Sequence, residues 1–298
     1  MKTCTTVLPE NRSLAAFYLV IVFMLVSISL SSQVLMPDNF YVRENVRTKR
    51  PVPYVHEREA DIMWSKRVWR TIDLREKFNH PLYYPETQIN NRRSLFDVVK
   101  RALFDRSITA FDNPVTDDEF TTRMNITQLN ELFNGGDSVS QEDPLNPGTY
   151  ITVWVPNPLE SRMIKAWWVK EDWFWDKQRS VMDVRIIAIC PLQEKLAPAS
   201  ENGGSGEVIG YKPLFWLHFE ELRPILAREE CYNTRNDAQR LSYDDVFMKR
   251  MFSSYIHKES NMYESGMPVI ELPGLEAQYE SDRIRSELAT MEHDFWNY

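Results

Sequence analysis

The sequence lacks the local patterns that mark common enzyme and metal sites. It has no Gly-x-Ser-x-Gly, no Gly-Lys-Ser/Thr and no His-Glu-x-x-His, the spacings that build a nucleophile elbow, a phosphate loop and a zinc site. The five histidines are scattered, at His56, His80, His218, His257 and His293. We therefore expect no enzymatic activity, no metal and no cofactor. A hydrolase whose site is assembled from distant residues is a weaker alternative.

The sequence also has fewer basic than acidic residues. The chain has 35 basic and 43 acidic residues, a net charge of −8. Nucleic-acid-binding proteins usually present a basic surface, so this balance excludes nucleic acid as an expected partner.

Long hydrophobic runs are limited to one, LAAFYLVIVFMLV, over residues 14–26. Thirteen residues are short for a membrane span, which needs about 20. Lys2 and Arg12 precede the run and small polar residues follow it, the order typical of a secretory signal. We predict a signal peptide over residues 1–32 and export from the cytoplasm, with cleavage near Ser31, Ser32 and Gln33. An uncleaved anchor extending through Leu30 is the alternative.

Cysteine is scarce, with three in the chain. Cys4 precedes the apolar run and would leave with the signal peptide. Cys190 and Cys231 remain, and an oxidising compartment permits a disulfide between them. Without Cα distances the sequence leaves two interpretations open, a Cys190–Cys231 disulfide or two buried free thiols.

Residues 33–55 have no apolar periodicity, and they contain three prolines and four basic residues. Each proline biases the preceding residue toward extended backbone. We interpret this segment as an extended arm that becomes ordered on a partner, with Phe40, Tyr41 and Val42 as its apolar anchors. A plain disordered leader is the alternative. Residues 56–298 are expected to form a single domain, which the turn-rich break at 134–148 would divide into halves 56–133 and 149–298.

Helical and strand patterns both occur in that domain, so we expect an α+β fold in which several helices pack on an antiparallel sheet. Apolar spacing predicts a helix from Glu57 through Val68. Ser-x-x-Asp and Thr-x-x-Glu patterns predict helices that begin at Ser94 and Thr116, with Asp117, Asp118 and Glu119 in a first turn. Two more helices are predicted, over residues 242 to about 255 and 275 to about 296. The last would have an apolar stripe of Ile284, Leu288, Met291 and Phe295.

A weak internal duplication is a further hypothesis. Residues 94–104, SLFDVVKRALF, align without gaps on residues 242–252, SYDDVFMKRMF, and share four identities. Each segment follows a Pro-Leu-aromatic-aromatic stretch that we expect to be extended.

Tryptophan is abundant, with nine in the chain and five between residues 154 and 175. Alternation in MIKAWWVKEDWFW and VMDVRIIAI, on either side of a polar turn, predicts an antiparallel hairpin. Consecutive strand residues face opposite sides, so we expect part of the cluster in the core and part in a protein interface. The candidate partner-binding residues are Trp167, Trp168, Trp173 and Trp175. A carbohydrate- or peptidoglycan-binding platform is the alternative.

Four blocks of the sequence resemble the GldN family, also called PorN, of gliding motility and type IX secretion. They are ADIMWSKRVWRTIDLREKFNHPLYYP, SLFDVVKRALFDRSITAFD, VKEDWFWDKQRSVMDVRIIAICP and FSSYIHKESN, and the resemblance extends from about Glu57 to the C-terminus. It implies a non-enzymatic periplasmic scaffold that forms a ring with an outer-membrane lipoprotein, GldK or PorK, and is linked to an inner-membrane protein, GldM or PorM. The family supplies no catalytic residues to carry over.

Overall fold

The computed structural model describes residues 48–89, 92–117, 119–142, 150–196, 208–233, 236, 239–260 and 275–296. The predicted signal peptide and its cleavage site, together with the anchors Phe40, Tyr41 and Val42, lie outside these residues. Residues Val46–Tyr298 belong to one compact unit.

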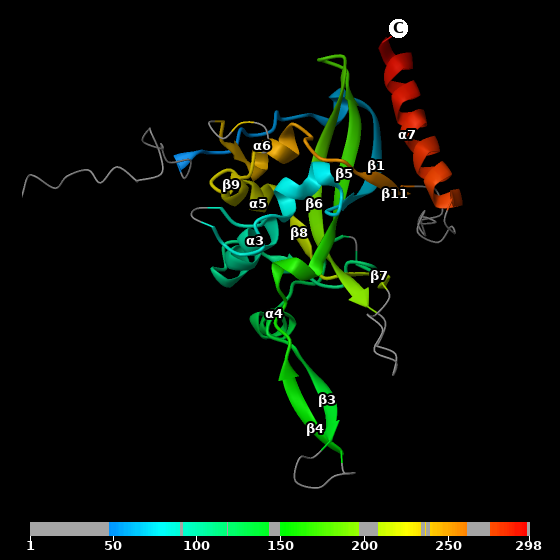
Figure 1. The fold of residues 1–298 in the computed structure, drawn as a ribbon. Helices are drawn as coiled ribbons and strands as arrows, with labels where there is room; N and C mark the ends of the chain where they lie inside the picture. Colours follow the sequence, from blue (N-terminus) through cyan, green and yellow to red (C-terminus); the bar gives the residue numbers. More distant parts are fainter. Residues whose placement is uncertain are drawn as a thin grey trace, which may run out of the picture. The chain divides into compact units, whose positions relative to one another are not determined.

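A seven-stranded sheet is the centre of this unit (Figure 1), in the order β11-β1-β5-β6-β8-β2 with β7 paired to β6. Its pairings are all antiparallel, so the expected α+β class with a mostly antiparallel sheet is confirmed. The predicted hairpin is present, and Trp168 of β5 pairs with Cys190 of β6. The strands are β1 (Ile62–Asp73), β2 (Ala110–Phe111), β5 (Ile164–Asp176), β6 (Val181–Leu196), β7 (Val208–Pro213), β8 (Trp216–His218) and β11 (Tyr255–Glu259).

The helix predicted from Glu57 is wrong, because this segment forms β1. The 3-10 turn η2 (Glu59–Asp61) directly precedes the strand. Val68 and Ile72 are buried on one face of β1, while Trp69 is buried on the other. An element that is apolar on both faces reproduces helical spacing by coincidence. Pairing with β5 along the whole strand decides the outcome.

Helix α3 (Leu95–Phe104) begins as predicted, with the Ser94 hydroxyl accepting a hydrogen bond from the Asp97 N–H at 3.2 Å. The helix predicted at Thr116 begins later, as α4 (Ile126–Phe133), where Asn125 and Gln128 form a reciprocal cap. The Asp117 carboxylate instead accepts hydrogen bonds from the backbone of Glu119, Thr121 and Thr122. It stabilises a turn, because three nearby N–H groups converge on it.

The C-terminal part differs from prediction in one helix and agrees in the other. Helix α6 (Tyr243–Met248) is shorter than expected, because Arg250 has a positive φ of 52° and the chain then enters β11. Helix α7 (Leu275–Trp296) is present as predicted. The remaining elements are η3 (Lys77–Asn79), α2 (His80–Tyr83), η4 (Ser161–Met163), α5 (Phe219–Leu226) and the pair β9 (Glu230–Cys231) with β10 (Leu241–Ser242).

The break expected at 134–148 contains a strand. There β3 (Gly136–Glu142) pairs with β4 (Tyr150–Pro156) as a separate two-stranded sheet. The two segments of the proposed duplication begin with equivalent helix caps. The Ser242 hydroxyl accepts a hydrogen bond from the Asp245 N–H, as the Ser94 hydroxyl does from the Asp97 N–H. However, the preceding stretch is helix α2 in one copy and strands β7 and β8 in the other. The duplication and the two halves stay predictions.

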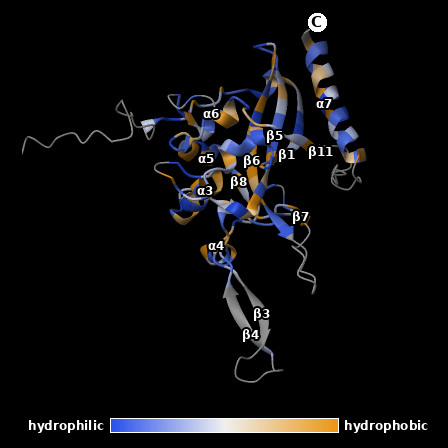
Figure 2. Cartoon of the chain, in the orientation of Figure 1, coloured by the Kyte–Doolittle hydropathy of each residue, from blue (hydrophilic) through white to orange (hydrophobic). Residues whose placement is uncertain are grey.

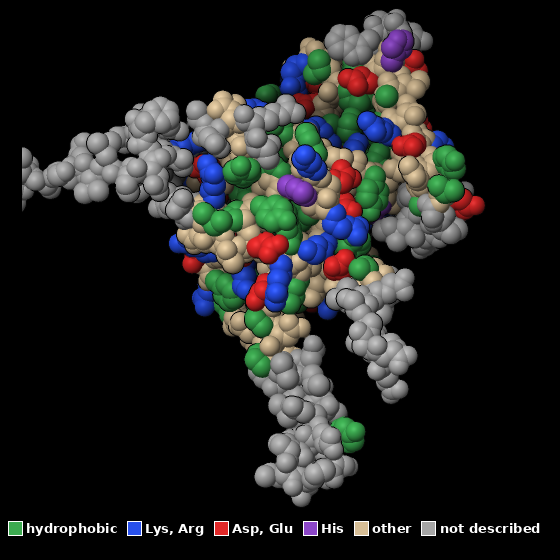
Figure 3. All heavy atoms as spheres, viewed as in Figure 1, with side chains coloured by type: hydrophobic (Ala, Val, Ile, Leu, Met, Phe, Trp, Pro, Cys, Tyr) green, Lys and Arg blue, Asp and Glu red, His purple; other side chains and the backbone are tan. Residues whose placement is uncertain are grey.

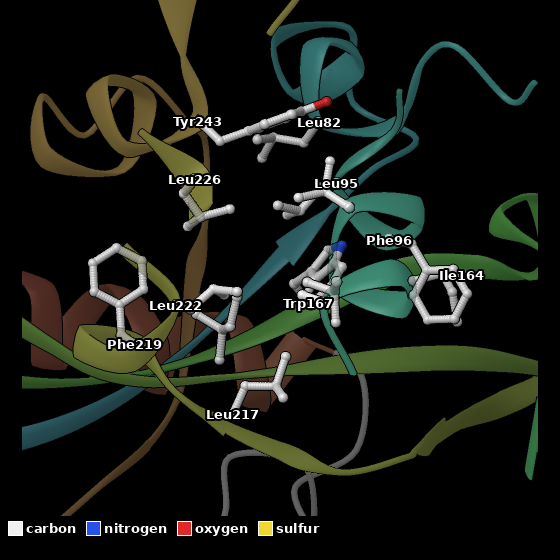
Figure 4. Packing of buried hydrophobic residues seen from close by; sticks show 14 of the residues in the cluster. Leu82, Leu95, Phe96, Ile164, Trp167, Leu217, Phe219, Leu222, Leu226 and Tyr243 are labelled. Atoms are coloured by element: carbon white, nitrogen blue, oxygen red, sulfur yellow. The ribbon is translucent and has the colours of Figure 1, made fainter. Parts of the chain in front are cut away.

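Helices cover one face of the sheet in two places. Near α3, α5 and α6 the large core contains Trp167, which Figure 4 shows among Leu95, Phe96 and Leu222. A smaller cluster joins Val68 and Ile256 of the sheet to α7. Hydrophobic residues alternate with hydrophilic ones along α7 in Figure 2, as expected of a helix with one buried side. The other sheet face has a third cluster, of Trp69, Ala188, Cys190 and Trp216.

Candidate interaction site

The four candidate tryptophans all lie on β5, and two of them are core residues. Trp167 is 1 % exposed and belongs to the large cluster. Trp175 is also buried, and its ring lies 4.8 Å from that of Phe295 on α7. These two rings are therefore packing groups of the domain itself.

Trp168 and Trp173 are half-buried, and other side chains pack against the faces of their rings. The ring of Trp168 stacks on His257 at 5.0 Å and lies 6.3 Å from that of Trp216. The guanidinium groups of Arg70 and Arg250 lie 5.4 and 5.5 Å from the centre of Trp173. A sugar-binding platform needs an open ring face, so this packing disfavours carbohydrate stacking on these residues.

A buried carboxylate, which sequence reasoning missed, organises the middle of this sheet face. Glu171 is fully buried in β5, and it accepts two hydrogen bonds from Arg250 at 2.9 and 3.1 Å. Arg70 forms an ion pair with it at 3.2 Å, and the indole N–H of Trp173 donates to it at 3.1 Å. Burial lowers the pKa of Arg70, and the charge of Glu171 opposes that shift. The arrangement fastens the segment after α6 to the sheet.

Both remaining cysteines are free thiols in the structure, and no bond joins them. Cys190 lies in the cluster with Trp69 and Trp216, whereas Cys231 lies in the large core, on the other side of the sheet. The Sγ of Cys231 donates to the carbonyl of Pro81 at 3.3 Å. The disulfide considered above is therefore not part of this structure, because the two side chains pack in different clusters.

The described histidines and acidic residues do not converge on a metal site. No group of three or more His, Cys, Asp or Glu in the described ranges could hold an ion. His257 is buried between Thr71, whose hydroxyl is 2.9 Å from Nδ1, and the ring of Trp168. Burial lowers the pKa of His257 to about 3, with a smaller contribution from the charge of Lys258. This ring is neutral at physiological pH and serves the packing of the sheet.

Residues 49–57, named the strap here, cross the surface of the domain before β1. Lys49 pairs with Asp245 of α6, and the Val52 carbonyl accepts from Arg223 of α5. The Tyr54 ring lies beneath two guanidiniums, at 4.4 Å from Arg223 and 5.2 Å from Arg185. The strap is therefore held mainly by charged and polar groups, and its residues 49–55 belong to the predicted arm.

A cleft of about 350 Å³ separates α7 from one end of β1. Trp64, Ser65 and Lys66 line its β1 side, and Ile284, Leu288 and Met291 line its α7 side. The α7 residues belong to the apolar stripe that the sequence predicts for this helix. Buried Ile284 and Leu288 anchor α7 to the sheet, and the cleft opens beside them.

Charges of both signs are interspersed over the face seen in Figure 3, with no large patch of one sign. Among the described helices, none combines the length and the apolar character that crossing a membrane requires.

Comparison with known families gives a match, whereas comparison with curated proteins gives none. The model of the family described as "Gliding motility associated protein GldN" matches residues 57–297. This range begins just before β1 and includes the sheet, the buried Glu171 cluster and α7. The chain belongs to the GldN family of gliding motility associated proteins.

Proposed function

We propose that this protein is a non-enzymatic scaffold of the periplasm that works in type IX secretion and gliding motility. It assembles into a ring with an outer-membrane lipoprotein of the GldK or PorK type, and an inner-membrane protein of the GldM or PorM type is linked to that ring. The observation that carries the proposal is the family match over residues 57–297. Because the match includes the whole described sheet, the folded domain as a unit carries the family role.

The chemistry of the interior supports a structural role. Buried charged groups join one element of the fold to another, as in the ion pair of Arg223 on α5 with Asp244 on α6 at 3.0 Å. Glu171 is likewise surrounded by its partners. We infer that these pairs fix the positions of the joined elements, because a buried ion pair often adds little net stability. A fixed arrangement suits a subunit that repeats in a ring.

The alternative of a carbohydrate or peptidoglycan binder gains no support from the tryptophan-rich hairpin. Trp167 and Trp175 are buried, and the rings of Trp168 and Trp173 meet His257 and two arginines. Interface roles for the half-buried Trp168 and Trp173 stay part of the proposal.

Affinity purification from the cell envelope tests the proposed function. The tagged full chain is expressed with its leader, extracted in mild detergent, purified, and analysed by mass spectrometry and light scattering. We expect recovery of the lipoprotein and the inner-membrane component, in particles far larger than one subunit. The untagged parent, expressed and purified in the same way, serves as the control for non-specific recovery. A monomeric protein with no recovered partner would contradict the scaffold role.

A further inference from the structure

Two arginines from different elements meet beside Trp173, on the face of the sheet that the helices cover. The guanidinium groups of Arg70, on β1, and Arg250, which follows α6, lie 5.4 and 5.5 Å from the centre of its ring. Trp173 also packs against the small cluster that joins α7 to the sheet. The two guanidinium groups therefore lie where the segment after α6 approaches the α7 cluster.

Arg285 of α7 adds a third positive charge to this place. Arg70 is paired with Ile256 in the β1–β11 ladder, and the Ile256 N–H donates to the Ser281 hydroxyl of α7 at 3.1 Å. Arg285 follows Ser281 by four residues, so the two lie on the same side of the helix. Burial lowers the pKa of Arg70, and the nearby positive charges of Arg250 and Arg285 lower it further.

Glu171 balances only part of this charge. Its carboxylate accepts two hydrogen bonds from Arg250 and one from the indole N–H of Trp173. The Nε of Arg70 lies 3.2 Å from the same carboxylate but lacks hydrogen-bond geometry. Arg285 is exposed and forms no ion pair with any residue in the described ranges. Three guanidinium groups beside one carboxylate leave an excess of two positive charges.

The opposite flank of α7 has a different charge balance. Arg283 pairs there with Glu259, Glu280 and Glu287. A helix turns by about 100° per residue, so Arg283 and Arg285 lie about 160° apart around it. The excess of positive charge is therefore a property of the Arg285 flank, although α7 as a whole has six acidic and two basic residues.

Two acidic residues lie closer to the Arg285 flank, and both are exposed. Asp282 is about 160° around the helix from the buried Ile284, so it faces outward. Glu292 is about two turns beyond Arg285, or roughly 10 Å along the axis. Neither forms an ion pair with Arg285 in the structure, so the excess charge remains available to a ligand.

We propose that Arg250, Arg285 and the hydroxyl of Ser254 bind a dianionic phosphate group, with Arg70 beneath them as a further source of positive charge. The side chain of Arg250 is 33 % exposed and uses two N–H groups on Glu171, so other donors of its five remain. The Ser254 hydroxyl lies 3.4 Å from Nη1 of Arg70. A phosphate with two negative charges balances the excess, whereas one carboxylate balances half of it.

A bound phosphate connects α7 directly to the segment after α6. Guanidinium groups bind phosphate oxygens through paired, charge-assisted hydrogen bonds, and here the two groups come from different elements. The ligand therefore stabilises the position of α7 on the sheet, which adds a binding function to the scaffold role and does not depend on ring assembly.

Titration calorimetry with inorganic phosphate tests the site. The full chain is expressed with its leader, purified from the envelope and titrated at constant ionic strength in chloride. We expect the parent to bind one phosphate per chain and Arg285→Gln to bind about ten-fold more weakly, because a charge-assisted hydrogen bond is lost. Arg285→Gln should unfold at the parent temperature, since this side chain is exposed and forms no ion pair with the described residues.

Arg283→Gln is the matched control, because it removes the same charge from the opposite flank of α7. Its affinity for phosphate should change less than about two-fold, since salt screens distant charges. Equal weakening in the two variants would overturn the site, as would a parent that does not bind phosphate. Neither result would affect the proposed scaffold role.

Succinate tests the chemical class of the ligand. It also carries two negative charges, but on separate carboxylates, whereas phosphate presents three acceptor oxygens on one atom. We expect succinate to bind about ten-fold more weakly than phosphate. Equal affinities would overturn the assignment to phosphate.

Vesicles distinguish a phosphate on a lipid from a soluble one. The parent is sedimented with vesicles that contain phosphatidate, a phosphate monoester, or an equal charge of phosphatidylglycerol, a diester. Sedimentation with phosphatidate that Arg285→Gln abolishes would support the site with a lipid as its ligand. Binding of inorganic phosphate without sedimentation would support it with a soluble ligand. Equal sedimentation with both lipids would indicate general attraction to a negative surface and overturn the proposal.

Discussion

Glu171 and Arg250, 79 residues apart in sequence, form a two-pronged pair at 2.9 and 3.1 Å, in which the Glu171 carboxylate is fully buried and the Arg250 side chain is 33 % exposed. The pair fastens the chain between α6 and β11 to the central strand β5. Replacing Glu171 with glutamine leaves Arg70 and Arg250 without their counter-charge, and breaking a buried pair typically costs about 3–5 kcal/mol. We expect Glu171→Gln to lower the free energy of unfolding by that amount, as measured by urea denaturation.

The neighbouring residue provides a matched control for this prediction. Asp172 pairs with Arg67 at 2.6 Å on the opposite face of the sheet, where both side chains are substantially exposed. Exposed pairs contribute about 0–1 kcal/mol, so Asp172→Asn should change stability little. Equal losses for both variants would show that Glu171 has no special role in fastening β5.

Trp167 and Trp168 offer a second comparison of neighbours. Trp167 is 1 % exposed in the large core, and truncation of such a residue costs about 3–5 kcal/mol. Trp168 is half-buried against His257 and Trp216. We expect Trp167→Ala to unfold or be degraded, and Trp168→Ala to remain folded with reduced recovery of partners. Thermal unfolding and affinity purification measure the two effects. If both variants stay stable and assemble normally, neither indole has the role assigned to it.

Elements whose signals are local could be predicted from the sequence. The Ser94 cap, the alternation of β5 and β6, and the apolar stripe of α7 each occupy a short window and appear as expected. The start of β1 was missed because residues 60, 63, 64 and 68, of which the first lies in η2 and the others in β1, have the spacing of a helix. Only pairing with β5, about 100 residues later, excludes the helix. A non-local contact therefore overrides the local pattern.

The buried charges were missed for a related reason. Glu171 lies between Val169 and Trp173 on one side of an apolar strand, and a carboxylate at that position requires a counter-charge. The sequence therefore contained a signal for a buried partner. It could not identify Arg250, which reaches Glu171 only because the chain turns after α6. The strap contacts could not be predicted for the same reason, because Lys49 and Tyr54 contact residues of α5, α6 and β6 that lie far away in sequence.

We expect the thiols of Cys190 and Cys231 to react slowly with thiol reagents in the native protein. Burial raises the pKa of Cys190 far above its usual range and that of Cys231 to about 12. The thiolate is the reactive form, so both groups remain protonated and unreactive toward a thiol reagent at pH 8. After denaturation without reductant we expect two reactive thiols per chain. If the leader is cleaved as predicted, N-terminal sequencing of the exported protein should find Ser32 or Gln33 as its first residue.

A third thiol would come from Cys4 and would show that the leader is retained, which contradicts signal cleavage. Loss of both thiols under denaturing conditions would instead indicate the Cys190–Cys231 disulfide that this structure does not contain.

His257 predicts a particular dependence of stability on pH. Its folded pKa of about 3 lies below the unfolded value of 6.5. Between these values the unfolded chain binds a proton that the native protein does not. His257 therefore does not lower the free energy of unfolding above pH 6.5. As the pH decreases from 6.5 toward 3, the free energy of unfolding falls by up to about 1.4 kcal/mol per pH unit because of this group.

The comparison that isolates this effect uses His257→Gln, which removes the titrating ring. We expect the variant to be less stable than the parent at pH 7 but to lose less stability between pH 6.5 and 4, measured by urea denaturation. Parallel curves for the parent and His257→Gln would contradict the assignment.

Two deletions separate the arm from the strap. Removing residues 34–47 keeps the pair of Lys49 with Asp245 and the Tyr54 ring beneath Arg223, so we expect an unchanged free energy of unfolding. Removing residues 34–55 strips these contacts and leaves the buried guanidinium of Arg223 with one fewer partner. A buried polar group that loses its partner costs about 1–3 kcal/mol, so this longer deletion should unfold earlier in urea.

The two deletions should behave alike in assembly. If the arm joins neighbouring copies, both lose the large particles measured by light scattering after purification from the envelope, although only the longer one is destabilised. A loss of particles confined to the longer deletion would assign assembly to the strap. Normal particles from both would leave the folded domain of residues 56–298 to make every contact, because each copy would then lack the segment that reaches beyond its own surface.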